Sequence, residues 1–204
     1  MSRAIVTVKT SESFWHPLWE AHYLPHFDYA EIIPVDFKRH SPGFKTWQYA
    51  TSLYNKAIRR LLPHYSLIVC VDVDEILVPD PEYYADFGDY LDHYKADVTE
   101  CVGYGIMEMD GDKPIDLSQR ITDQRKYWLR DPKYDKPVIT KKRIHYFPGQ
   151  HKCNTNGYRD RDLRMFHLRY ADLSSFLSRR TGSFSHILDC QEKAVSIPEK
   201  WRVI

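Results

Sequence analysis

Residues 67–77 read LIVCVDVDEIL, and they say more about the architecture than any other part of the chain. Five apolar residues in a row are typical of a buried strand, and two aspartates follow where that strand should end. In open α/β sheets, ligands bind outside the carboxyl ends of the strands. Asp72 and Asp74 share one side-chain parity, so both carboxylates can face one point there. The simpler alternative is a strand end whose acidic side chains are only solvated. Glu75 weakens this alternative, because three acids in four residues between apolar runs are a costly way to build a plain turn.

The residues before this stretch predict an α/β fold. Residues 4–8 and 31–37 are β-rich, and Pro34 places the second of these strands near a sheet edge. Residues 13–24 carry helix-start signals, and residues 46–62 have apolar side chains at helical spacing. The first 80 residues therefore read β-α-β-α-β, which is typical of a doubly wound, mostly parallel sheet.

The second half of the chain has weaker patterns, and no repeat or linker separates it from the first. We therefore expect a single domain over residues 1–204. The expected elements are a helix at 83–94, a strand at 101–109, a loop at 110–135, a strand pair or a strand with an approach loop at 138–147, a strand at 163–170 and a short amphipathic helix at 173–180.

Composition narrows the class of protein. A hydrophobic content of 43% and a charged content of 28% are those of an ordinary globular protein. A net charge of +1 argues against nucleic-acid binding by the whole surface, and no obligate protein partner is evident. The four cysteines show no paired spacing, which favours a reducing compartment. No signal peptide or membrane span is expected, so we predict a cytoplasmic protein, with peripheral contact at the inner membrane face left open.

Three motifs, in this order, resemble the GT-A-fold glycosyltransferases, particularly the family-2-like group. They are VDVDEIL at 71–77, DKPVI at 135–139 with PGQH at 148–151, and FHLRY at 166–170. The resemblance spans roughly residues 4–175. It implies a GT-A-like (Rossmann-like), mostly parallel central sheet flanked by helices. It also implies a nucleotide-binding half at 1–80 and an acceptor-binding, metal-completing half at 81–204.

The resemblance further implies a metal site. In such enzymes the Asp-x-Asp pair holds a divalent cation against the donor diphosphate, and a late histidine often completes the coordination. By position this assigns Asp72, Asp74 and His151 to the metal, with Asp72 also near the donor ribose; His145 and His167 are rivals to His151. Carboxylate oxygens suit Mn²⁺ or Mg²⁺, which would neutralise charge on the leaving nucleoside diphosphate.

Other residues are candidates for contacts with the donor. Lys136 and Lys152 could meet the diphosphate as point charges, although for any single lysine a solvated basic face is the simpler interpretation. Thr7 and Lys9 occupy the position of the family's nucleotide-base site. Asp36, after the second strand, could accept a hydrogen bond from the base or ribose.

The catalytic base is the least defined assignment. An inverting transferase needs a carboxylate that takes the proton of the acceptor hydroxyl. Glu108, Asp110 and Asp112 follow a predicted strand on the acceptor side, and Asp110 is preferred by position. A retaining enzyme would need no dedicated base, and the sequence leaves the stereochemistry open.

The expected function is a metal-dependent glycosyltransferase. It would move a sugar from a nucleoside-diphosphate sugar to a hydroxyl of a glycan, lipid-linked or small-molecule acceptor. One alternative is a haloacid-dehalogenase-like phosphatase with Asp72 as nucleophile and Asp74 as acid. That family carries its acidic pair on the first strand, whereas two βα units precede Asp72 here. A second alternative is a non-catalytic sugar-binding domain, which would be expected to lose the acidic pair.

Overall fold

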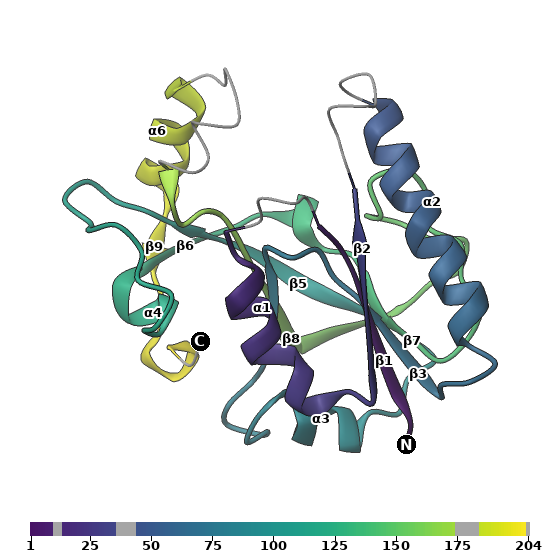
Figure 1. Cartoon of the computed structure of the whole chain (residues 1–204). Helices are drawn as coiled ribbons and strands as arrows, with labels where there is room; N and C mark the ends of the chain where they lie inside the picture. Colours follow the sequence, from purple (N-terminus) through teal and green to yellow (C-terminus); the bar gives the residue numbers. More distant parts are fainter. Residues whose placement is uncertain (10–13, 36–43, 174–183, 203–204) are drawn as a thin grey trace.

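The computed structural model describes residues 1–9, 14–35, 44–173 and 184–202 of the chain. A mixed sheet runs through these residues, with helices packed against it (Figure 1). The strands are β1 (Arg3–Lys9), β2 (Tyr29–Pro34), β3 (Leu67–Cys70), β4 (Glu75–Pro79), β5 (Val98–Met107), β6 (Tyr127–Arg130), β7 (Pro137–Thr140), β8 (Tyr158–Tyr170) and β9 (Val195–Ser196). The α-helices are α1 (His16–Tyr23), α2 (Phe44–Leu61), α3 (Phe87–His93), α4 (Ile121–Gln124) and α6 (Phe184–Lys193), and the 3-10 helices are η1 (Leu24–His26), η3 (Pro132–Tyr134) and η4 (Glu199–Trp201).

The first half of the sheet is parallel, as the sequence predicted. β1 lies between β2 and β3 and pairs in parallel with both, so β2 is an edge strand, as Pro34 indicated. Alternate residues of these strands face two different cores. Ile5 and Val69 pack in the core that contains Trp19 of α1, whereas Val6 and Ile68 pack in the core that contains α2. Helices therefore cover both faces of this part of the sheet.

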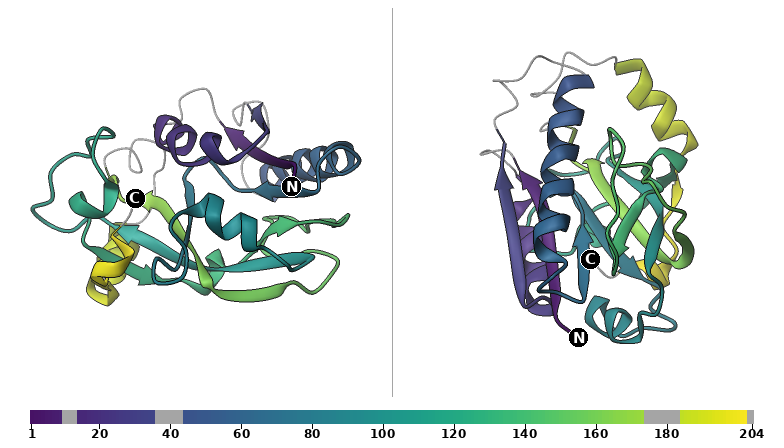
Figure 2. Two further views of the ribbon diagram at one scale, coloured as in Figure 1. Left: turned by 90° about the horizontal axis from the view of Figure 1, so that it is seen from below. Right: turned by 90° about the vertical axis from the view of Figure 1, so that its right-hand side faces the viewer.

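The second half of the sheet differs from the expectation. Among the pairings of the described strands, three are parallel and five are antiparallel, so the sheet is mixed and not mostly parallel. Parallel neighbours need long crossover connections, usually through a helix. In this half α3 and α4 have only seven and four residues, and most strands turn back on their neighbours. β9 ends the sheet at the side opposite to β2 (Figure 2, left).

Individual elements were predicted with mixed success. The helix at 46–62 and the strand at 163–170 are confirmed as α2 and as part of β8. The predicted loop at 110–135 is wrong, because it contains α4, β6 and η3. Of the region 138–147, only its start belongs to a strand, β7, and Tyr146 makes an isolated bridge with Cys153. The predicted helix at 173–180 lies outside the described residues, except for its first residue. No helix in the described part of the chain is long and apolar enough to cross a membrane.

Candidate functional site

The two aspartates of the acidic motif lie at the carboxyl end of β3, as the sequence predicted. β3 ends at Cys70, Asp72 and Asp74 follow in the connection, and β4 begins at Glu75. β7 is antiparallel to both β3 and β5, so these two strands run in the same direction. The segment after β5, which contains Asp110, therefore leaves the same edge of the sheet as the acidic motif.

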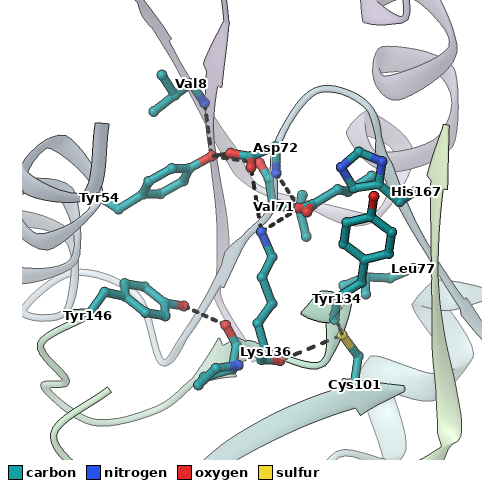
Figure 3. A network of polar contacts seen from close by, with 12 residues as sticks. Val8, Tyr54, Val71, Asp72, Leu77, Cys101, Tyr134, Lys136, Tyr146 and His167 are labelled. Carbon is teal, nitrogen blue, oxygen red and sulfur yellow. Dashed lines mark hydrogen bonds and ion pairs between the residues drawn. The ribbon is translucent and has the colours of Figure 1, made fainter. Parts of the chain in front are cut away.

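A hydrogen bond on one side and an ion pair on the other hold the carboxylate of Asp72 (Figure 3). The Tyr54 hydroxyl, on α2, donates to Asp72 Oδ1 at 2.7 Å and accepts the Val8 N–H of β1 at 3.1 Å. On the other side, Lys136 Nζ lies 3.5 Å from Asp72 Oδ2. Burial, and then the charge of Asp72, raise the pKa of the Tyr54 hydroxyl well above its ordinary value, so the hydroxyl remains a donor. Asp72 is thus fixed in one orientation.

Glu75 and Lys136 form a buried ion pair beneath this carboxylate. Each side chain is only 3–4% exposed, and Lys136 Nζ lies 2.7 Å from Glu75 Oε2. The same oxygen accepts the Asp72 backbone N–H at 2.7 Å. Burial acts to lower the pKa of Lys136, but the carboxylates of Asp72 and Glu75 raise it above its ordinary value. Lys136 is therefore a cation that compensates the acids around it. We call Tyr54, Asp72, Glu75 and Lys136 the acid clamp.

Asp74 differs from Asp72 in being open. Its side chain is half-buried, and within the described residues its carboxylate makes no hydrogen bond or ion pair. Its backbone is fixed, because the Asp74 carbonyl accepts the Leu168 N–H of β8 at 2.8 Å. On this side of the site the ring of Tyr134 stacks on His167 with centroids 4.2 Å apart. An anchored backbone with an unpaired carboxylate is well suited to receive a cation or a hydroxyl group.

The three candidate histidines lie in different surroundings. His151 is exposed and follows Gly149 and Gln150, whose φ angles of 86° and 63° turn the loop back on itself. Partial burial and the charge of Lys136 lower the pKa of His151, whereas Glu75 and Asp72 act in the opposite direction. His151 is thus within electrostatic reach of the acid clamp. His167 lies on β8 opposite Glu75.

His145 has no such relation to the acidic motif. It lines a hollow of about 280 Å³ together with Arg59, Arg143, Ile144 and Asn154. The acidic motif takes no part in that lining.

The donor chemistry of the site fits a hard divalent cation in part. Among the described residues, no group of three His, Cys, Asp or Glu side chains is arranged to hold a metal ion. Asp74 offers an unpaired carboxylate, and Asp72 retains lone pairs beyond those that Tyr54 and Lys136 occupy. Mg²⁺ and Mn²⁺ commonly take one or two carboxylates and complete their shell with water and substrate phosphate oxygens. The assignment of His151 as a third ligand stays a prediction.

The predicted donor contacts are not brought together as one set. Thr7 is fully buried in β1, and its hydroxyl has no hydrogen-bond partner in the described part of the chain. Lys9 Nζ lies 3.0 Å from His16 Nδ1. Lys136 belongs to the acid clamp, whereas Lys152 is exposed. Asp36 lies outside the described residues.

The candidate bases after β5 differ in whether their carboxylates already have hydrogen-bond or ion-pair partners. Glu108 accepts hydrogen bonds from the Leu173 N–H at 2.9 Å and from the guanidinium of Arg125 at 3.3 Å. Arg125 is 1% exposed, so Glu108 compensates a buried charge. Asp112 accepts the Met109 N–H at 2.8 Å and caps the local turn. Asp110 is exposed and has no side-chain partner among the described residues, which leaves it available to a ligand.

Two side chains at the site, Tyr54 and Tyr134, were not predicted as functional residues. Tyr54 occupies an ordinary apolar position of a helix, so nothing marked its hydroxyl as a partner of Asp72. Tyr134 directly precedes the quoted DKPVI motif. The signal that could have found it is Gly103-Tyr104-Gly105, because glycine inside a strand often marks a close approach of another segment.

No protein-family model matches the chain, and no curated protein matches it in sequence.

Proposed function

We propose that this chain is a metal-dependent glycosyltransferase with a GT-A-like fold. It would transfer a sugar from a nucleoside-diphosphate donor to a hydroxyl of a glycan, lipid-linked or small-molecule acceptor. One observation carries the proposal. At the carboxyl end of β3, Asp72 is held by Tyr54 and Lys136, while the neighbouring carboxylate of Asp74 has no partner among the described residues. Helices on both faces of the β2-β1-β3 sheet and the position of the motif at its carboxyl edge support the same assignment.

In this proposal Asp72 and Asp74 would hold Mn²⁺ or Mg²⁺, with His151 or His167 as a further ligand. When bound, the ion supplies neutralisation of the negative charge that develops on the leaving diphosphate. The residues of the chain orient the ligand-binding carboxylate in advance. Tyr54 and Lys136 keep the Asp72 carboxylate in place before the ligand arrives, so little reorganisation is needed when the site is filled.

The acceptor would be activated from the β5 side of the same edge. Asp110 is exposed and uncommitted there, whereas Glu108 is engaged by Arg125 and Leu173. A carboxylate in this role takes the proton of the acceptor hydroxyl as that oxygen attacks the anomeric carbon. If the enzyme inverts configuration, Asp110 is the group that the arrangement offers for this step.

The experiment that tests the proposed function is release of a nucleoside diphosphate from a panel of UDP-, GDP-, ADP- and dTDP-sugars with Mn²⁺. Release from one donor, abolished by EDTA and by Asp74→Ala, would support the transferase. Phosphate release from p-nitrophenyl phosphate, with silence towards every sugar nucleotide, would favour the phosphatase. Silence in both assays, with an unchanged melting temperature on addition of Mn²⁺ and nucleotide, would favour the non-catalytic domain.

A further inference from the structure

Tyr134 lies directly against the sheet at Gly103 of β5, which has no side chain. A Cβ atom built on Gly103 would lie 2.3 Å from Tyr134 Cβ and 2.5 Å from the Tyr134 carbonyl carbon, which is far inside van der Waals contact. A Cβ on Gly105 would lie 3.7 Å from Tyr134 Cε2, an ordinary contact. The last residue of η3 can therefore sit on β5 only because Gly103 is glycine.

A second contact fixes the plane of the Tyr134 ring. It stacks on the imidazole of His167 with a centroid separation of 4.2 Å and an interplanar angle of 12°. His167 is itself 9% exposed and is held in β8, opposite Glu75. Gly103 thus fixes the backbone of Tyr134 and His167 fixes its ring, so the hydroxyl lies at a defined position.

The hydroxyl of Tyr134 is free to bind a ligand. The residue is half-buried, yet the hydroxyl has no hydrogen-bond partner in the described part of the chain. Figure 3 shows the hydroxyl end of the Tyr134 ring directed away from Cys101 and toward His167.

Tyr54 and Tyr134 come from opposite halves of the fold. Tyr54 reaches Asp72 from α2, beside β1 and the nucleotide-binding half, whereas Tyr134 comes from the β6–β7 connection. Asp74 belongs to the turn between these halves, and its carbonyl accepts the N–H of Leu168, the residue that follows His167, on which the Tyr134 ring stacks. A diphosphate bound at Asp74 with its nucleoside toward β1 would therefore carry its sugar to the Tyr134 side.

We infer that Tyr134 is a sugar-binding residue whose hydroxyl donates to a hydroxyl of the sugar that the donor carries. This inference rests on the proposed glycosyltransferase function. It goes beyond that function by assigning recognition of the sugar, as distinct from the nucleotide, to one side chain. A phenol hydroxyl is chemically suited to sugar hydroxyls, because it can donate one hydrogen bond and accept another.

The test compares Tyr134→Phe with wild type in calorimetric titrations with Mn²⁺. The ligands are the sugar nucleotide that the donor panel selects and the corresponding nucleoside diphosphate. We expect Tyr134→Phe to bind the sugar nucleotide about five- to tenfold more weakly, the effect of one hydrogen bond, and the nucleoside diphosphate as wild type does. Equal affinities of variant and wild type for the sugar nucleotide would overturn the inference. A loss of the same size for both ligands would overturn it too, as would a rise in KM for the acceptor alone.

Two controls distinguish a specific effect of the Tyr134 hydroxyl from a general or structural effect. Tyr83→Phe removes a hydroxyl from a residue that is 66% exposed and lies outside the site, so it should bind both ligands like wild type. Tyr134→Phe retains the ring that stacks on His167 and the backbone that lies against Gly103, so its melting temperature should match that of wild type. If wild type binds no sugar nucleotide of the panel, the proposed function itself fails, which differs from an active enzyme that is indifferent to Tyr134→Phe.

Discussion

Lys136 Nζ lies 2.7 Å from Glu75 Oε2, and this carboxylate oxygen also accepts the backbone N–H of Asp72. The third acid of the motif is therefore part of the scaffold, because it is buried and paired with a buried cation. The division within the motif is clear. Glu75 fixes the backbone, Asp72 is held by side chains of neighbouring elements, and Asp74 is left open.

Replacing Lys136 by Met should destabilise the protein strongly. The substitution leaves Glu75 buried without its counter-ion, and breaking a buried pair in this way costs about 3–5 kcal/mol. Activity should fall with it, because Asp72 loses one of the groups that orient its carboxylate. Urea unfolding measures the change. The double variant Lys136→Met/Glu75→Gln should recover part of the loss, since the uncompensated charge is then absent.

Lys152→Met is the matched control for that substitution. Lys152 is exposed, so its replacement should change the free energy of unfolding by no more than about 0.5 kcal/mol. Sugar-nucleotide affinity separates the roles further. A drop in that affinity at unchanged stability would assign Lys152 to the diphosphate. Equally small losses of stability in Lys136→Met and Lys152→Met would contradict the role of Lys136 as the buried counter-ion of the acid clamp.

Asp110→Asn and Glu108→Gln should have opposite profiles. Asp110 is exposed and unpaired among the described residues, so Asp110→Asn should leave the melting temperature unchanged and lower kcat by about 10²–10⁴-fold. Glu108 compensates the buried Arg125, so Glu108→Gln should lower the free energy of unfolding by about 1–3 kcal/mol. Steady-state kinetics and thermal denaturation of the two variants give the comparison. An unaffected kcat in Asp110→Asn would remove Asp110 from the mechanism.

Stability should fall on mild acidification because of His22. Its Nε2–H donates to the Leu77 carbonyl at 2.9 Å, and burial is the main reason why its pKa falls to about 4 from an ordinary value of 6.5. The folded-state pKa lies below the unfolded-state pKa, so the unfolded chain takes up more protons between these values. The contribution is complete above pH 6.5 and is lost as the pH falls toward 4. At pH 5 the loss from this residue amounts to about 2 kcal/mol relative to pH 7.5.

Urea unfolding at the two pH values tests this assignment with His22→Gln and His64→Gln. The first variant should be less stable at pH 7.5 and should lose most of that additional pH dependence. His64 is exposed, so His64→Gln should keep the pH dependence of wild type. The same pH dependence in wild type and His22→Gln would show that another group is responsible.

Gly103→Ala and Gly105→Ala should separate the placement of Tyr134 from general effects on β5. The added methyl group at Gly103 collides with Tyr134, so the variant should lose about 1–3 kcal/mol of stability. It should also lose sugar-nucleotide affinity in the manner of Tyr134→Phe. The methyl group at Gly105 meets only ordinary contacts, and that variant should behave like wild type in both respects. Identical behaviour of the two variants would argue against a specific contact between Tyr134 and Gly103.

The parts of the fold that the sequence revealed are those with strong local patterns. The helical spacing of 46–62, the edge strand marked by Pro34 and the acidic turn after β3 were all predictable, because each depends on residues close together in sequence. β6 was missed because four residues flanked by charged and polar side chains carry too little periodicity to be recognised. The direction of the later strands was missed because pairing depends on long-range contacts.

The site shows the same limit. Asp72 and Asp74 could be placed at the end of a strand, but whether each carboxylate is occupied or open depends on Tyr54 and Lys136, which lie far from them in sequence. Glu108 and Asp110 are two residues apart and both carry a carboxylate, and only the partners of Glu108, Arg125 and Leu173, distinguish the two. Sequence spacing therefore locates a group of candidates, whereas packing determines which of them a ligand can reach.

The most direct test of the central claim is the binding of Mn²⁺ in the presence of a nucleoside diphosphate, followed by electron paramagnetic resonance for wild type and Asp74→Asn. The substitution retains the shape of the side chain and breaks no contact among the described residues, so the melting temperature should be unchanged. We predict that Mn²⁺ affinity falls at least about tenfold in Asp74→Asn, because the open carboxylate would be a direct ligand. Equal Mn²⁺ affinity in the two proteins would contradict the account.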